Sequence, residues 1–67
     1  MYSKENKKLI DKLLNDKKFQ EIVNQDLGHV QNVKVDWENN QIIFQGESLG
    51  KILKIDEILE VLKTQIQ

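Results

Sequence analysis

The sequence predicts an α+β fold in which helices pack on one face of a small antiparallel sheet. Apolar residues recur at helical spacing at both ends of the chain, whereas residues 33–38 between them alternate apolar and polar side chains. The few residues that break regular structure divide these three parts: Gly28, Asn39, Asn40, Gly46 and Gly50. With 67 residues and no linker-like tract, residues 1–67 are expected to form one small domain.

The N-terminal part contains two apolar clusters that cannot share one face of a continuous helix, because about 100° per residue places them on nearly opposite sides. They are Leu9, Ile10, Leu13 and Leu14, and then Phe19, Ile22 and Val23. Either the helix breaks at residues 15–18, with Asp16 as N-cap of a second helix, or it is continuous and one apolar side faces a partner. Asn and Asp are poor helix-interior residues and good caps, which favours the break.

The second helix is expected to end near Leu27, with Gly28 at the left-handed capping position. A β-hairpin over about residues 30–46 follows, with a two-residue turn at 39–40. This turn predicts that Trp37 pairs with Ile42 across the strands. One face of the hairpin is then apolar and is formed by Val33, Val35, Trp37, Ile42 and Phe44.

The C-terminal part predicts a helix from Asp56 onward. Its apolar stripe is Ile52, Ile55, Ile58, Leu59, Leu62 and Ile66. Asp56 is also a suitable N-cap, so residues 51–55 form either the start of this helix or a third strand.

The composition restricts the chemistry. The chain has no Cys and all ten basic residues are Lys, which excludes disulfides, thiolate metal sites and bidentate guanidinium contacts. The net charge of −1 is uneven: residues 1–18 carry six Lys and three acids, and the remainder four Lys and eight acids. Without a signal-like or bilayer-spanning apolar run, a cytoplasmic protein is expected. The abundance of Lys, Asn and Ile indicates an AT-rich genome, such as that of a low-GC bacterium or its phage.

Catalytic and metal-binding patterns are not found. His29, the only His, follows a Gly at a predicted helix end, where a loop or capping role is expected. The stretch GESLGK at 46–51 has three residues between its glycines, whereas a phosphate loop has four. Asp36 and Glu38 share one strand face but lack the wrapped loop that hard cations need. We therefore expect no enzyme, cofactor, metal site or small-molecule substrate.

The function expected from the sequence is protein–protein contact by a small regulatory or inhibitory protein, with an unidentified protein or a second copy as partner. The partner-binding residues are predicted to be Leu9, Ile10, Leu13 and Leu14, the cluster farther in sequence from the hairpin. A structural homodimer is one alternative. The other is nucleic-acid binding through residues on the opposite helix face: Lys4, Lys7, Lys8 and Lys12.

The element order over residues 14–66 resembles in pattern the later part of a KH module, an RNA-binding family. The GxxG loop of that family would fall at residues 15–18, where this chain has NDKK and no Gly. The resemblance implies shared architecture, and no family is assigned from it.

Overall fold

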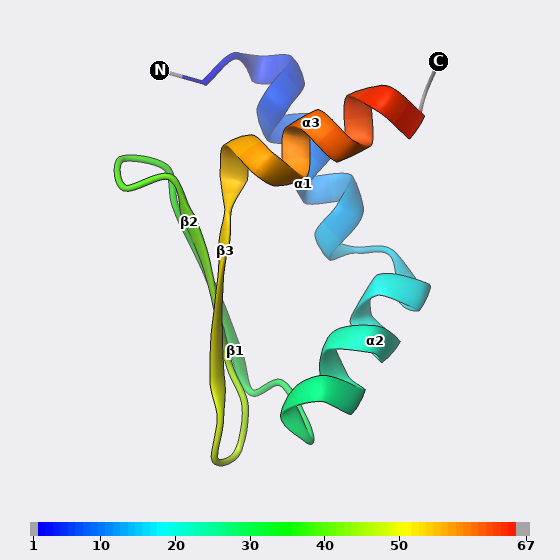
Figure 1. Ribbon diagram of the computed structural model, residues 1–67, viewed down its shortest axis with the longest axis vertical. Helices are drawn as coiled ribbons and strands as arrows, with labels where there is room; N and C mark the ends of the chain where they lie inside the picture. The colour runs from blue at the N-terminus through cyan, green and yellow to red at the C-terminus, as the bar shows by residue number, and fades with distance from the viewer. Residues whose placement is uncertain (1, 66–67) are drawn as a thin grey trace.

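The computed structural model describes residues 2–65, which contain three helices and three strands (Figure 1). The fold is α+β, as the sequence predicts, and its sheet is antiparallel. The elements in chain order are α1 (Lys4–Leu14), α2 (Lys17–Leu27), β1 (Asn32–Asp36), β2 (Gln41–Gln45), β3 (Gly50–Lys54) and α3 (Ile55–Gln65).

A break between α1 and α2 resolves the conflict between the two apolar clusters. The side chain of Asp16 caps α2 by accepting a hydrogen bond of 3.0 Å from the backbone N–H of Phe19. The side-chain amide of Gln20 in α2 donates a hydrogen bond of 2.8 Å to the carbonyl of Leu14, the last residue of α1, and so links the two helices. Both clusters now reach one core, because Ile10 and Val23 are buried together. The predicted break is therefore confirmed.

The predicted end of α2 is confirmed as well. The helix stops at Leu27, and Gly28 follows with a φ of 84°, which side chains with a Cβ rarely adopt. Its ψ of −60° lies outside the left-handed helical region, so the predicted left-handed cap is replaced by another conformation with positive φ. The Asn24 side-chain oxygen then accepts a 2.9 Å hydrogen bond from the Val30 N–H, which directs the chain toward the sheet.

The hairpin register predicted from a two-residue turn is wrong by two residues, because the connection spans residues 37–40. The Asp36 carboxylate accepts hydrogen bonds from the backbone N–H and the side-chain amide of Asn39, at 3.3 and 2.8 Å. Asn40 adopts a positive φ of 58°, and its N–H lies 3.4 Å from the carbonyl oxygen of Trp37. The polar side chains of the turn thus enlarge the loop and remove Trp37 from the strand.

The apolar face of the hairpin survives this correction, because a shift of two residues preserves the alternation of a strand. Val35 lies opposite Ile42, and Val33 opposite Phe44. Trp37 is half-buried and packs against the core from the loop.

The third strand is present, so the open choice for residues 51–55 is settled. β3 pairs antiparallel with β2 and places Ile52 opposite Ile43. Ile52 therefore belongs to the outer face of the sheet and not to the helical stripe to which the sequence pattern assigned it; its side chain is 58% exposed. α3 begins at Ile55, one residue before the predicted Asp56. Ile66 lies outside the described residues.

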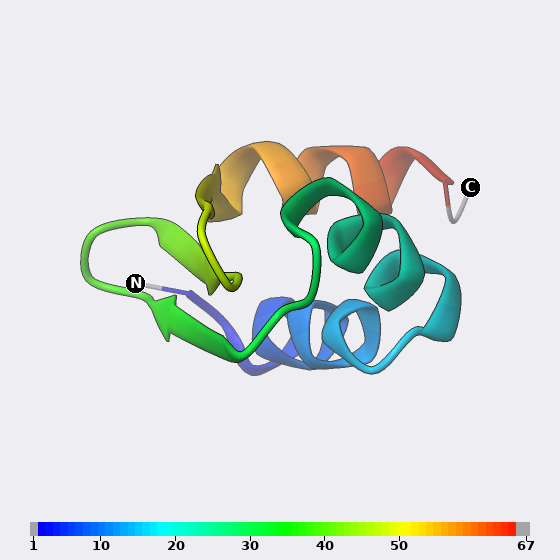
Figure 2. The same ribbon diagram turned by 90° about the horizontal axis from the view of Figure 1, so that it is seen from below.

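All three helices lie on one side of the sheet (Figure 1). Viewed from below, α1 and α3 occupy opposite sides of the helical layer, and α2 lies beside their far ends (Figure 2). The strand order is β1-β2-β3, so β2 is central. The core between helices and sheet consists of Ile10, Val23, Leu27, Ile42, Phe44, Ile55 and Leu59.

Candidate protein-interaction surface

An apolar groove of about 330 Å³ lies where α3 meets the end of α1 and the start of α2. Among the described residues that line it, Glu57 alone is charged. The apolar side chains that line it are Leu13, Phe19, Ile58, Val61 and Leu62. Val61 is 54% exposed, so part of this apolar lining is open to solvent.

The helix break builds one wall of this groove. Leu13 lies in the last turn of α1 and Phe19 in the first turn of α2, and the capped turn at Asn15 and Asp16 brings them together. The turn is fixed on both sides, since the Asn15 side-chain amide donates to the Asp11 carbonyl at 2.9 Å. Phe19 also touches the core through an edge contact with Phe44, at 6.0 Å between ring centroids.

The other wall is α3. Glu57 and Val61 are one turn apart, and Ile58 and Leu62 follow them at the same spacing. Ile58 and Leu62 are half-buried against the core, so the exposed apolar side chain of this wall is that of Val61.

The four predicted partner-binding residues lie in different places. Ile10 is 0% exposed and lies in the core, where no partner reaches it in this fold. Leu9 and Leu14 are half-buried against the core, and Leu13 alone lines the groove. The predicted cluster therefore contributes one residue to this surface.

One groove residue that was not predicted from the sequence, Val61, could have been found from its position on α3. Ile55, Ile58, Leu59 and Leu62 form the helical stripe, and Val61 is apolar but lies off it. A second apolar edge on α3 was therefore visible in the sequence.

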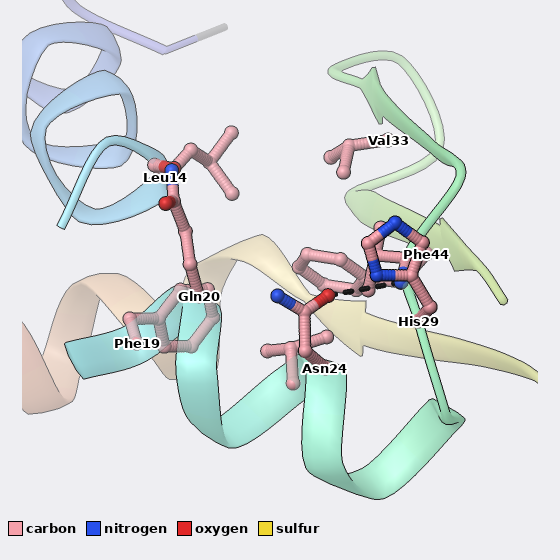
Figure 3. A pocket seen from close by; sticks show the side chains of 9 residues that line it. Leu14, Phe19, Gln20, Asn24, His29, Val33 and Phe44 are labelled. Atoms are coloured by element: carbon pink, nitrogen blue, oxygen red, sulfur yellow. Dashed lines mark hydrogen bonds between the residues drawn. The ribbon is translucent and has the colours of Figure 1, made fainter. Parts of the chain in front are cut away.

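A second cavity of about 260 Å³ opens between α2 and the sheet (Figure 3). Its walls include Phe19, Val33 and Phe44, with Gln20, Asn24 and His29 as polar members. The side-chain amides of Gln20 and Asn24 already bind backbone groups, and Figure 3 draws the hydrogen bond that the Asn24 oxygen accepts. None of the hydroxyl residues lines the cavity beside His29.

The predicted nucleic-acid contacts are all exposed on α1: Lys4, Lys7, Lys8 and Lys12. The Lys7 ammonium lies 5.7 Å from the centroid of the Trp37 ring. Tyr2 packs on the same ring at 5.3 Å between centroids and an interplanar angle of 56°. The hairpin loop and the start of the chain thus form a small aromatic cluster beside the Lys7 side chain.

The charged groups show modest electrostatic effects. A hydrogen bond from the Asn39 side chain lowers the pKa of Asp36, and one from the Asn40 side chain lowers the pKa of Asp56. Lys51 and Asp26 form an exposed ion pair at 3.3 Å. Within residues 2–64, no three His, Asp or Glu side chains converge so as to hold a metal ion.

None of the three helices in the described part of the chain, each of 11 residues, is long enough to cross a bilayer. The chain matches no protein-family model, no curated protein and no solved structure.

Proposed function

We propose that this protein acts by contact with another polypeptide at the groove between α1, α2 and α3, in a regulatory role and without a catalytic step. The observation that supports this proposal is the apolar lining of the groove, which leaves Val61 more than half exposed. Covering apolar surface of this kind stabilises a complex by roughly 25 cal/mol per Å² of area removed from water.

Photo-crosslinking from single positions tests this proposal. A benzophenone amino acid replaces Val61 in one variant and Ile52 in a second. The two side chains are similarly exposed, at 54% and 58%, but Ile52 lies on the outer face of the sheet. We expect polypeptide adducts from position 61 in cells of the source organism and few from position 52. Equal yields from both positions, or none from position 61, would contradict the proposal.

Nucleic-acid binding is a second candidate. The exposed Lys side chains of α1 and the position of Lys7 beside the Trp37 ring favour it. Binding through Lys–phosphate contacts weakens as salt rises. The double variant Lys8→Glu, Lys12→Glu is expected to abolish a low-salt mobility shift with RNA or single-stranded DNA. If the wild-type chain shifts neither, this candidate is rejected.

A further inference from the structure

We propose that the free edge of β3 pairs with the same edge of a second copy, so that the two sheets join into one continuous antiparallel sheet. This surface is separate from the groove, so neither contact depends on the other. The backbone of β3, its side chains and the contrast with β1 support such a dimer.

The backbone of β3 directs hydrogen-bonding groups out of the sheet. Toward β2, the Gly46 N–H donates to the Leu49 carbonyl at 2.8 Å, and the Ile55 N–H donates to the Asn40 carbonyl at 3.1 Å. Residues of an antiparallel strand alternate between bonding to the neighbouring strand and pointing away from it. The odd-numbered residues from 49 to 55 therefore bond toward β2, and the even-numbered residues between them point away.

These outward groups are open to another strand. Among residues 2–65, no turn, loop or cap bond is made to the backbone of Gly50 or Ile52. β3 lies nearest the viewer of the three strands in Figure 1, and no other segment passes in front of it. An extended strand is the partner that satisfies such a row of alternating donors and acceptors.

β1, the opposite edge of the sheet, is protected against such pairing. Asn32 lies opposite Gln45, yet the Gln31 N–H also donates to the Gln45 carbonyl, at 2.8 Å. Two residues thus face one, and this bulge interrupts the edge. Lys34 at the centre of β1 protects it further. By contrast, the five residues of β3 pair one to one with those of β2.

The outer face of the sheet favours a second copy as the added strand. Lys34, Ile43 and Ile52 lie opposite one another on the three strands and form one row across this face. The row is polar at the β1 edge and ends at the β3 edge in Ile52, whose side chain is 58% exposed. When Ile52 of two copies meets, the row becomes apolar across the contact with Lys34 at each end, as in an interface with an apolar centre and a polar rim.

A two-fold axis beside Ile52 sets the register. Gly50 then lies opposite Lys54 of the second copy, so that residues 50, 52 and 54 all face the new strand. The next register in one direction would place Lys51 of the two copies directly opposite each other, which is unfavourable. The next register in the other direction would leave Gly50 beyond the end of the opposing strand.

The Lys side chains of β3 do not oppose this pairing. Lys51 lies opposite Phe44 and so points to the helical side of the sheet, where it forms an ion pair of 3.3 Å with Asp26. Its neighbour in the second copy is Leu53. Lys54 lies opposite Gly50, which has no side chain to obstruct it.

Sedimentation equilibrium of the purified chain tests the dimer. One added strand buries less than the roughly 800 Å² per partner of a standard interface, so we expect monomers and dimers to exchange at micromolar concentrations. Ile52→Lys places like charges opposite each other and is expected to weaken dimerisation about tenfold or more. Leu49→Lys is the matched control, because Leu49 is 57% exposed but precedes the paired strand. It is expected to leave the dimer unchanged, with circular dichroism confirming that both variants are folded.

Disulfide crosslinking locates the axis. The chain has no Cys, so a single introduced Cys reports only its own contact with a second copy. The Cα atoms of a hydrogen-bonded antiparallel pair lie about 5.5 Å apart, within the range of about 4.4–6.8 Å that a disulfide spans. Under mild oxidation we expect Ile52→Cys to give a covalent dimer and Leu49→Cys to give little.

A pair of variants tests the register. Gly50→Cys and Lys54→Cys are each expected to stay uncrosslinked alone, because each position lies opposite a different residue of the second copy. An equimolar mixture of the two is expected to form a covalent heterodimer.

Three results would overturn the inference: a wild-type chain that stays monomeric up to millimolar concentration, equal disulfide yields from Ile52→Cys and Leu49→Cys, or a mixture of Gly50→Cys and Lys54→Cys that does not crosslink. The groove is tested separately. In the photo-crosslinking experiment, an adduct from position 52 with twice the mass of the chain reports this dimer, whereas adducts with foreign proteins from position 61 report the groove. A β3 dimer without foreign adducts from position 61 would reject the proposed function and retain this inference.

Discussion

Asn40 in the hairpin loop accepts a hydrogen bond of 3.0 Å on its side-chain oxygen from the backbone N–H of Asp56, at the start of α3. The same oxygen accepts from the Tyr2 hydroxyl, and the Asn40 carbonyl accepts from the Ile55 N–H at 3.1 Å. One loop residue thus joins the N-terminal segment, the hairpin and α3. Because the first N–H groups of a helix have no partner within it, Asn40 acts as a cap supplied from a distant part of the chain.

Replacement of Asn40 separates its backbone role from its side-chain role. Asn40→Ala loses the side-chain acceptor and places an unfavourable residue at φ 58°, so we expect a loss of about 2–3 kcal/mol of unfolding free energy. Asn40→Gly keeps the backbone conformation and is expected to cost about 1 kcal/mol. Denaturant melts of both variants measure the difference. An Ala variant as stable as the Gly variant would contradict the backbone role.

Acid sensitivity follows from the two lowered carboxyl pKa values. Hydrogen bonds from Asn39 and Asn40 lower the pKa of Asp36 and Asp56 below the ordinary value of 3.8. A group whose folded pKa is lowered contributes its stability in full above the unfolded pKa and loses it as pH falls through the folded pKa. We expect the midpoint of urea unfolding to be flat from neutral pH to just above 4 and to fall below it. The Asp36→Asn, Asp56→Asn double variant is expected to show a smaller fall.

Neighbouring residues of β2 test the face assignment of the sheet. Phe44 is 2% exposed and Gln45 is exposed on the other side. We expect Phe44→Ala to destabilise the chain by about 3–5 kcal/mol and Gln45→Ala by less than about 0.5 kcal/mol. Trp37→Ala is expected to fall between them, because the Trp37 side chain is only half-buried. Denaturant melts that rank Gln45→Ala as the most damaging would reject this assignment.

Elements that depend on local chemistry could be predicted from the sequence. Asp16 and Gly28 act within their own turns, so the helix break and the end of α2 were readable from residue type. The hairpin register could not be predicted in this way. The hydrogen bonds from Asn39 to Asp36 favour a longer loop over a two-residue turn, and the residue types alone do not show which of the two is more stable. Residues 51–55 suit a strand or a helix, and pairing with β2 decides between them.

The candidate surface was harder to predict than the fold. The sequence identified Leu13 because the two apolar clusters are out of phase. The packing of α1 on α3 decides which of its neighbours are buried. The periodicity of a single helix gives no information on that packing. Ile10 and Leu13 belong to the same cluster, yet the first is in the core and the second borders the groove.

Close packing at Gly46 gives the last prediction. A Cβ at this position would lie 2.5 Å from the carbonyl oxygen and 2.8 Å from the Cβ of Leu27, the buried last residue of α2. The Gly46 N–H also closes the loop to β3 by donating to the Leu49 carbonyl at 2.8 Å. Gly46→Ala must therefore push α2 away from the sheet, and we expect a loss of about 1–3 kcal/mol.

Gly50→Ala is the matched control, because the nearest atom to its added Cβ is the Phe44 carbonyl oxygen at 3.5 Å, an ordinary contact. Its φ lies outside the positive region, so Ala also restricts the unfolded chain at no strain in the folded one. We expect Gly50→Ala to change the unfolding free energy by less than about 0.5 kcal/mol. Thermal and denaturant melts of the two variants measure the contrast. Equal stability of both would show that α2 does not approach the β2–β3 loop as closely as this packing requires.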